Sequence, residues 1–456
     1  MNLDKKERTV AGKDDNRRER DILMNVQNVQ DLKPSKFNYI YLRGNEYVVF
    51  NTFSKALILM DEETIKILNS DIIKDNNETI NILKDNGFLV EADFDENNFL
   101  KYYNNKARFS TTYFSLTIAP SLKCNFDCPY CFENKREGTM SREIQEAIID
   151  FVKQKIENGV KIIEITWYGG EPLLQFSIIR YLCERINELC KEKNVKCKMG
   201  MISNGYLLTE EIVSFLEKYN ISFQVTLDGM EKNHDKRRYL KNGLGTFERI
   251  ANNLRLFEGK NVDVYVRMNV DNYNQQDYPQ LSEFIDSLKN KRMILYPAVT
   301  EKINERKKER QKNYMTDSSY DDFISITRKK GLFKFKESSL PISNDVGNIP
   351  NDRCYFCAAE LENSCVIDDK GNVYKCWDEV GHEDYCFNIL RPNDINYQSM
   401  LRYMGDNVFD DEKCSSCTFL PICFGGCKFH RYHLKRYACA FNEDSVKEYI
   451  EECLLK

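Results

Sequence analysis

The stretch YFSLTIAPSLKCNFDCPYC, residues 113–131, joins a strand pattern to a cluster of three cysteines. Apolar residues occupy every second position of Phe114–Ile118, which is the period of a β-strand with one buried face. The cysteines follow with the spacing CxxxCxxC, at Cys124, Cys128 and Cys131. A thiol cluster directly after a strand predicts a reactive site at the carboxyl end of that strand.

The cysteine usage of the whole chain favours metal or cluster ligation over disulfides. The chain has 456 residues and 17 cysteines, and its charged N-terminus is followed by no apolar core of a signal peptide. Disulfide frameworks are typical of short secreted chains, so we expect a cytoplasmic protein with reduced thiols. A zinc site would need a fourth ligand, and no His or Cys lies close in sequence. Three thiolates suit an iron–sulfur cluster with one free iron.

The composition excludes two broad classes of function. Hydrophobic residues make up 42% and charged residues 30% of the chain, which is typical of a soluble globular protein with a sizeable core. No apolar run reaches membrane-spanning length, so we expect no membrane partner. The net charge of -5 gives no electrostatic footprint for nucleic acid.

Strands and helices alternate downstream of the cysteine cluster. Five more strands are predicted at 161–168, 195–203, 221–227, 262–270 and 292–299, with helices at 141–157, 172–193, 209–219, 246–258 and 278–290. This alternation predicts a parallel sheet with right-handed crossovers. Six units are too few for a closed eight-stranded barrel, so we predict an α/β fold built on a partial (β/α)6 TIM-like barrel.

Polar motifs follow these strands, at the end of the barrel where chemistry is expected. They are WYGGEP with Gly169, Gly170 and Glu171, ISNG with Ser203 and Asn204, VTLDG with Thr226, and HDKRR with Arg238. Glycines let the backbone approach a ligand closely, and carbonyls or a glutamate can accept hydrogen bonds from an ammonium group. Roles as turn or surface residues remain the alternatives for these positions.

With these motifs in place, residues of about 110–300 resemble the radical S-adenosylmethionine (radical SAM) enzymes. Their signature is CxxxCxxC with an aromatic residue, here Tyr130, before the last cysteine. The resemblance implies that the three cysteines hold a [4Fe–4S] cluster and that the amine and carboxylate of SAM chelate the fourth iron. Reductive cleavage of SAM then yields a 5′-deoxyadenosyl radical that abstracts hydrogen from the substrate. Thr226 and Arg238 match positions that contact the ribose and carboxylate of SAM.

The rest of the chain divides into four further segments. Residues 1–35 are charged and aperiodic, and we expect disorder. Residues 36–105 predict a small α/β module that resembles a winged-helix peptide-recognition element, which captures a leader peptide by strand addition. A simple cap on the barrel is the alternative. Residues 301–350 predict a charged helical linker, and 351–456 form a cysteine-rich domain.

The cysteine-rich segment resembles the SPASM extension of radical SAM enzymes, which carries auxiliary [4Fe–4S] clusters. CSSCTFLPICFGGC at 414–427 has its spacing, and VIDDKGNVYKC predicts a hairpin turning near Gly371. The resemblance assigns one cluster to Cys357, Cys376 and Cys427, and a second to Cys414, Cys417, Cys423 and Cys439. Two alternatives remain for Cys354. Either it is the eighth ligand, or the first cluster keeps an open iron. Cys365 and Cys386 fall outside the pattern. Structural zinc, with His430 and His433 nearby, is the alternative.

Three functions follow from these patterns. The first is a peptide maturase that forms a thioether or C–C crosslink in a ribosomally made precursor peptide, with a one-electron donor such as flavodoxin or ferredoxin. The second is an anaerobic sulfatase-maturing enzyme that forms formylglycine. Such enzymes have an Asp base directly after the hairpin cysteine, whereas this chain has Trp377, and Asp378 follows as a candidate base. A one-residue shift turns a strand side chain to the other face, which weakens this reading. The third is a non-catalytic, zinc-stapled binding protein.

Overall fold

The computed structural model describes residues 31–74, 77–299, 315, 317–332, 354–387, 390, 395–435, 437, 439 and 443–455. The expectation of disorder for residues 1–30, and most of the predicted linker at 301–350, lie outside the described residues.

Six parallel strands form the body of the fold, as the sequence predicts. They are β6 (Tyr113–Ile118), β7 (Ile162–Trp167), β8 (Lys196–Ser203), β9 (Ile221–Thr226), β10 (Val264–Val270) and β11 (Met293–Val299). They lie side by side in sequence order, and each pairs in parallel with the next. Their side chains are buried on both faces, which is typical of a parallel sheet covered by helices. The partial (β/α)6 barrel is therefore confirmed.

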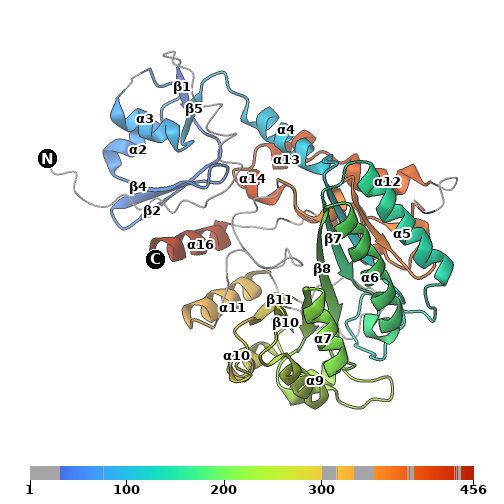
Figure 1. Ribbon diagram of the computed structural model, residues 1–456. Helices are drawn as coiled ribbons and strands as arrows, with labels where there is room; N and C mark the ends of the chain where they lie inside the picture. The colour runs from blue at the N-terminus through green and yellow to red at the C-terminus, as the bar shows by residue number, and fades with distance from the viewer. Residues whose placement is uncertain are drawn as a thin grey trace.

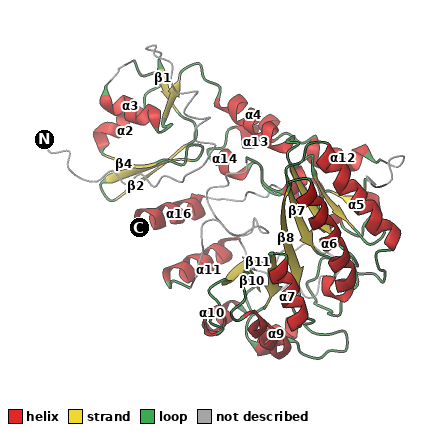
Figure 2. Cartoon of the chain, viewed as in Figure 1, coloured by secondary structure: helices red, strands yellow, loops and turns green. Residues whose placement is uncertain are grey.

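Crossover helices cover the outside of this sheet (Figure 2). They are α5 (Arg142–Glu157), η1 (Pro172–Gln175) continuing into α6 (Phe176–Glu192), α7 (Glu210–Lys218), α9 (Phe247–Leu254) with η2 (Arg255–Phe257), and η3 (Gln275–Asp277) with α10 (Tyr278–Ser287). The starts follow ordinary capping chemistry, because Ser141 and Thr209 accept hydrogen bonds from backbone N–H groups of the first turn. A further helix, α8 (Glu231–Arg237), was not expected, since the stretch EKNHDKR has no apolar period.

A hairpin of the cysteine-rich domain extends the barrel sheet. Strands β12 (Ser364–Ile367) and β13 (Val373–Tyr374) form the predicted hairpin, with Gly371 in the left-handed conformation at its turn. β12 then pairs in parallel with β6, which makes a sheet of eight strands in the order β11-β10-β9-β8-β7-β6-β12-β13. The sequence predicts the hairpin but not this docking, because the partners are about 250 residues apart in the chain.

The N-terminal module forms a small α/β unit with strands and helices near the predicted places. It contains β1 (Leu32–Pro34), β2 (Asn38–Arg43), β3 (Glu46–Asn51), β4 (Leu57–Met60), α2 (Glu62–Leu68), α3 (Glu78–Asp85) and β5 (Leu89–Glu91). The expectation of disorder up to residue 35 is wrong for its last part, since β1 pairs with β5 and Leu32 is buried in the core of the module. A long-range pairing orders a segment that has no local signal.

The remaining helices connect and cover these parts. They are α4 (Glu96–Arg108), α11 (Asp317–Lys329), η5 (Ala358–Glu360), η6 (Trp377–Glu379), η7 (Glu383–Tyr385), α12 (Tyr397–Met404), η9 (Val408–Asp410), α13 (Glu412–Ser415), α14 (Leu420–Cys423), α15 (Lys428–His433) and α16 (Glu443–Leu455). Helix α16 lies beside the β2–β4 sheet (Figure 1), where Val446 and Ile450 pack on Val48 and Phe50. Within the described part of the chain, none of the helices has the length and apolar character needed to cross a bilayer.

Candidate active site

The cysteine loop between β6 and α5 carries the three thiols, of which Cys124 and Cys128 are buried and Cys131 is half-buried. Cys124 and Cys128 are each only 6% exposed, and the backbone N–H of Phe126 lies 3.4 Å from Cys124 Sγ. Burial raises the pKa of Cys124 and of Cys131 to about 12, so these thiols stay protonated at neutral pH unless a cation binds them. Burial acts to lower the pKa of Lys135, but negative charge on the three cysteines and on Glu133 would outweigh burial and raise this pKa. The charges of all three sulfurs thus act on one cation of the loop, Lys135.

The glycine pair after β7 packs against the backbone of this cysteine loop. A Cβ atom on Gly170 would lie 2.5 Å from the carbonyl oxygen of Lys123, and one on Gly169 would lie 2.3 Å from that of Ser121. The N–H of Glu171 donates to the Lys123 carbonyl at 2.9 Å. The sequence predicts that these glycines allow close approach to a ligand, whereas the close neighbour that the structure places there is the cysteine loop itself.

We expect Gly170→Ala to lower the iron content of the barrel site, because the added methyl group displaces the cysteine loop. The measurement is iron and acid-labile sulfide per chain after anaerobic purification. Gly243→Ala is the matched control, since Gly243 has a φ of +85° but nothing within 4 Å of the added Cβ. The alanine of this control variant carries backbone strain of about 1 kcal/mol but does not clash with any neighbour. Equal iron content in the two variants would contradict this role of Gly170.

Glu171 connects the end of β7 to the end of β8. Its carboxylate is fully buried and accepts hydrogen bonds from Leu173 N at 3.0 Å, Ser203 Oγ at 2.8 Å and Asn204 N at 2.7 Å. Burial raises the pKa of Glu171. Three internal donors occupy most of the carboxylate's acceptor positions, so Glu171 positions the neighbouring loop. Its predicted contact with the ammonium group of SAM stays a prediction.

Asn204 reaches back from β8 to the cysteine loop. Its Nδ2 donates to Asn125 Oδ1 at 2.8 Å, and its Oδ1 accepts from Tyr206 N at 3.0 Å. The Nδ2 of Asn125 is buried without a hydrogen-bond partner. A buried amide donor beside Cys124 suits an acceptor group of a bound ligand.

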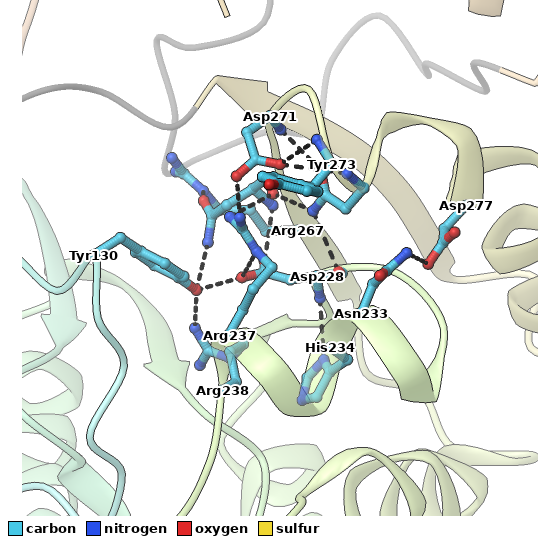
Figure 3. Close-up of polar contacts among 12 residues, drawn as sticks. Tyr130, Asp228, Asn233, His234, Arg237, Arg238, Arg267, Asp271, Tyr273 and Asp277 are labelled. Atoms are coloured by element: carbon cyan, nitrogen blue, oxygen red, sulfur yellow. Dashed lines mark hydrogen bonds and ion pairs between the residues drawn. The ribbon is translucent and has the colours of Figure 1, made fainter. Parts of the chain in front are cut away.

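Tyr130 joins the cysteine loop to the ends of β9 and β10 (Figure 3). Its hydroxyl donates to Asp228 Oδ2 at 2.5 Å, and it accepts from Arg238 Nη1 at 2.8 Å and Asn269 Nδ2 at 3.2 Å. Arg238 is 9% exposed, its Nε is buried without a partner, and its charge acts on the Cys128 thiol. A buried cation with a free donor beside the cysteines fits the carboxylate of an amino-acid ligand.

Asp228 is the centre of this network, a role that the sequence did not indicate. It is fully buried, its Oδ2 lies 3.3 Å from Arg237 Nε, and its Oδ1 accepts from Asn269 N at 3.0 Å. Burial acts to raise its pKa, but Arg237 and Arg238 outweigh burial and lower it. Arg237 also contacts Asp271. The signal in the sequence was an acidic residue at a strand end followed by paired arginines, which a simple turn also explains.

His234 and Thr226 complete the end of β9. His234 Nδ1 accepts from Asp228 N at 3.1 Å, and its Nε2 lies 3.0 Å from Thr246 Oγ1. Burial lowers the pKa of His234 to about 3, so the ring is neutral. Thr226, a predicted SAM contact, is buried at the end of the strand.

The hairpin of the cysteine-rich domain reaches the same site. Trp377 stacks on Tyr168 with ring centroids 4.9 Å apart, and its Nε1 donates to Thr117 Oγ1 at 3.0 Å. Asp378, the candidate base, has its Oδ2 3.6 Å from Cys376 Sγ. Arg136, after the cysteine loop, bridges Asp368 at 2.9 Å and Asp369 at 2.7 Å in the hairpin turn. Tyr168 and Arg136 are site residues that the sequence did not reveal.

The predicted auxiliary ligands are not assembled into a metal site: among the described residues, no three His, Cys, Asp or Glu side chains are placed to hold a metal ion. Burial raises the pKa of Cys376, and the charges of Asp378 and Glu379 act in the same direction. Cys414 Sγ accepts from Arg431 Nη1 at 3.5 Å, and Cys417 Sγ lies 3.4 Å from Phe419 N. Donors aimed at sulfur are typical of the surroundings of metal-bound thiolates.

The other cysteines of this domain lie in different surroundings. Cys354 packs at the edge of an apolar cluster with Phe37 and Val408, and its carbonyl accepts from Asn104 Nδ2 at 2.6 Å. Cys423 is 8% exposed on α14. Cys365 and Cys386, which fall outside the ligand pattern, are also buried.

Comparisons with known proteins agree with this geometry. Residues 118–285 match the model of the Radical SAM superfamily. A cysteine-type anaerobic sulfatase-maturating enzyme of Clostridium novyi is 25% identical over 342 residues, which are 69% of this chain and 87% of the relative. The radical SAM cyclopropyl synthase TigE of Paramaledivibacter caminithermalis is 22% identical over 451 residues, 88% of this chain and 90% of the relative.

Solved structures share the fold. Native anSMEcpe with bound AdoMet and the Kp18Cys peptide has a TM-score of 0.56 at 20% identity, covering 75% of this chain and 97% of that one. SuiB of Streptococcus suis bound to S-adenosylmethionine has a TM-score of 0.51 at 15% identity, covering 91% of this chain and 99% of that one. At these identities the likeness is one of fold.

Proposed function

The chain is a radical SAM enzyme, and from that premise we propose that it matures a ribosomally made precursor peptide by forming a thioether or carbon–carbon crosslink. Enzymes of this type act on peptides or peptide-borne residues, and the similar structure of anSMEcpe contains bound AdoMet and the Kp18Cys peptide. TigE, named as a cyclopropyl synthase, aligns along most of the chain. The proposal is therefore the particular bond, a thioether or carbon–carbon crosslink, that the radical chemistry forms in the peptide.

The chain's own residues would hold SAM and its cluster at the carboxyl ends of β6 to β9. Cys124, Cys128 and Cys131 would hold a [4Fe–4S] cluster, which supplies the electron for cleavage of SAM. The unpartnered donors Asn125 Nδ2 and Arg238 Nε lie beside the thiols and suit a carboxylate. Glu171 and Asp228 would position the binding loops. An external one-electron donor, such as a flavodoxin or ferredoxin, completes the proposed reaction.

Trp377 is the observation that favours crosslinking over sulfatase maturation. It occupies the place directly after the hairpin cysteine, where sulfatase-maturing enzymes resembling this barrel have an Asp base. Its indole stacks on Tyr168 and donates a hydrogen bond to Thr117, so an aromatic side chain occupies the place of the Asp base. Asp378 lies beside the Cys376 thiol instead. We propose Asp378 as a base only in a substrate complex, because its carboxylate contacts the thiol of a predicted cluster ligand in this structure.

The N-terminal module is proposed to bind the leader of the precursor. In its sheet of order β2-β3-β4, one face packs on α16 through Val48 and Phe50. The other face packs on the module's helices through Val49. Because both faces are covered, the outer strands β2 and β4 are where an extended peptide would add to the sheet. Main-chain hydrogen bonds would give affinity there without requiring a side-chain pocket.

Two auxiliary clusters are proposed for the cysteine-rich domain. Cys357, Cys376 and Cys427 would hold the first, and Cys414, Cys417, Cys423 and Cys439 would hold the second. Cys354 would be a further ligand of these clusters, or the first cluster would keep an open iron. An open iron would accept a thiolate of the substrate.

Anaerobic metal analysis and a peptide assay test this function together. We expect about twelve irons per chain, four for each of three clusters. With reductant and SAM, a cysteine-containing precursor peptide should lose a pair of hydrogen atoms by mass spectrometry, as crosslinking requires. Conversion of a peptide cysteine to an aldehyde would instead establish sulfatase-type maturation. Zinc without iron would overturn the radical assignment and leave a metal-stapled binding protein.

A further inference from the structure

The N-terminal module and the start of α4 form hydrogen bonds to the segment that carries Cys414 and Cys417. The carbonyl of Ser415, between these cysteines, accepts from Lys36 Nζ at 2.5 Å and from Asn97 Nδ2 at 3.0 Å. Lys36 Nζ also donates to Asn97 Oδ1 at 2.7 Å, which closes a small ring of hydrogen bonds. Lys36 and Ser415 are 379 residues apart in sequence, so only the tertiary structure joins them.

A second anchor holds the other side of the same loop. Thr52 Oγ1 donates to the Thr418 carbonyl at 2.5 Å, and Thr418 Oγ1 returns a bond to the Lys36 carbonyl at 3.4 Å. The rings of Tyr39 and Phe419 lie 5.3 Å apart. Thr52 is only 1% exposed, so this contact is part of the interior. Cys417 is thus enclosed between two attachment points on the module.

Lys36 is itself held firmly in place. Its backbone N–H donates to Glu96 Oε2 at 3.0 Å, and Ser35 Oγ donates to Glu96 Oε1 at 2.5 Å. Glu96 is 8% exposed and lies at the start of α4. The Glu96 carboxylate therefore holds the backbone of residues 35 and 36 in place. This fixes the direction in which the Lys36 side chain points toward Ser415.

Two cations therefore flank the two thiols from different parts of the chain. Arg431 Nη1 donates to Cys414 Sγ at 3.5 Å, and the ammonium group of Lys36 donates to the carbonyl of Ser415, which lies between Cys414 and Cys417 in the chain. A cluster held by four thiolates carries net negative charge, which grows on reduction. Nearby positive charge stabilises the reduced form and raises the reduction potential.

We propose that the N-terminal module packs against the second auxiliary site and holds the loop of Cys414 and Cys417 in place. Lys36 is then a positioning residue that fixes this loop and raises the reduction potential of the cluster bound there. This inference rests on the second auxiliary cluster of the proposed function. It gives the module a role besides peptide recognition, because movement of the module on binding a peptide would act directly on the cluster loop.

The test compares Lys36→Met with Lys36→Arg in the full-length protein, purified without oxygen. Iron and sulfide are counted, and each cluster is titrated electrochemically by electron paramagnetic resonance. The signal lost in a Cys414→Ala/Cys417→Ala variant identifies the second auxiliary cluster. We expect Lys36→Met to lower the potential of that signal alone, or to lose about four irons, and Lys36→Arg to retain wild-type behaviour.

Lys33→Met is the matched control, because Lys33 Nζ donates to the Phe94 carbonyl within the same module. It should leave both the iron count and all potentials unchanged. Unchanged potential and iron in Lys36→Met, in a protein that holds about twelve irons, would overturn the inference while leaving the proposed function intact. A Cys414→Ala/Cys417→Ala variant that keeps the iron content of the wild type would instead refute the second auxiliary cluster, and the inference with it.

Discussion

Replacement of Cys124, Cys128 and Cys131 together with alanine is expected to remove about four irons per chain and to abolish cleavage of SAM. The loop of residues 119–141 contains no other Cys or His, so no other thiol or imidazole in the loop replaces the three cysteines once they are gone. Iron and sulfide analysis after anaerobic purification measures the first effect. Detection of 5′-deoxyadenosine by chromatography after addition of dithionite and SAM measures the second.

The matched control is Cys183→Ala, a substitution of a buried cysteine on α6 whose Sγ contacts Met199. It should retain full iron and full SAM cleavage, because Cys183 belongs to the apolar core. Retention of twelve irons by the triple variant, within error, would contradict the assignment of the barrel cluster. Loss of iron by the control as well would point to a general folding defect, and single cysteine-to-serine variants would then separate ligation from packing.

Asp228→Asn is expected to lower the free energy of unfolding by about 1–3 kcal/mol, because it removes the buried carboxylate beside Arg237 and Arg238, while Arg237 keeps its contact with Asp271. Asp228 receives Arg237 directly and reaches Arg238 through the hydroxyl of Tyr130. Asparagine keeps the shape of the side chain but not its charge, so the loss reports electrostatics. Denaturant unfolding of the apoprotein, followed by fluorescence, measures it.

The pH dependence provides a sharper check of the same prediction. The guanidinium groups lower the pKa of Asp228 below its unfolded value of about 4. The stability that Asp228 contributes is therefore fully present above about pH 4 and is lost as the pH falls through the lower pKa of the folded state. The difference between wild type and Asp228→Asn should shrink below about pH 4. A difference that is independent of pH would show that packing, and not charge, holds this network.

Asp263→Asn is a suitable control for both measurements. Asp263 pairs with Arg292 at 2.8 Å, but both side chains are 42% exposed. An exposed pair contributes about 0–1 kcal/mol, because water and salt screen it. An equal loss of stability in the two variants would contradict the central role assigned to Asp228.

Local patterns in the sequence predicted most of the barrel. The alternation of apolar runs with amphipathic segments indicated all six strands of the barrel and their crossover helices, because these signals arise from residues close together in the chain. The same reasoning missed β1 and α8, which are ordered by contacts with distant residues or by polar groups alone. It also missed Asp228, since an acidic residue at a strand end reads equally well as part of a turn.

The spacing of three cysteines after the first strand of a parallel sheet was enough to predict the radical SAM domain that residues 118–285 match. This is possible because ligand type and spacing are properties of a short stretch. Only the tertiary structure decided how the loops are held. It packs Gly169 and Gly170 against the cysteine loop, places Trp377 on Tyr168, and brings Lys36 to Ser415. These contacts join residues that are tens to hundreds apart, and their partners follow from sheet order and side-chain packing, which no local pattern encodes.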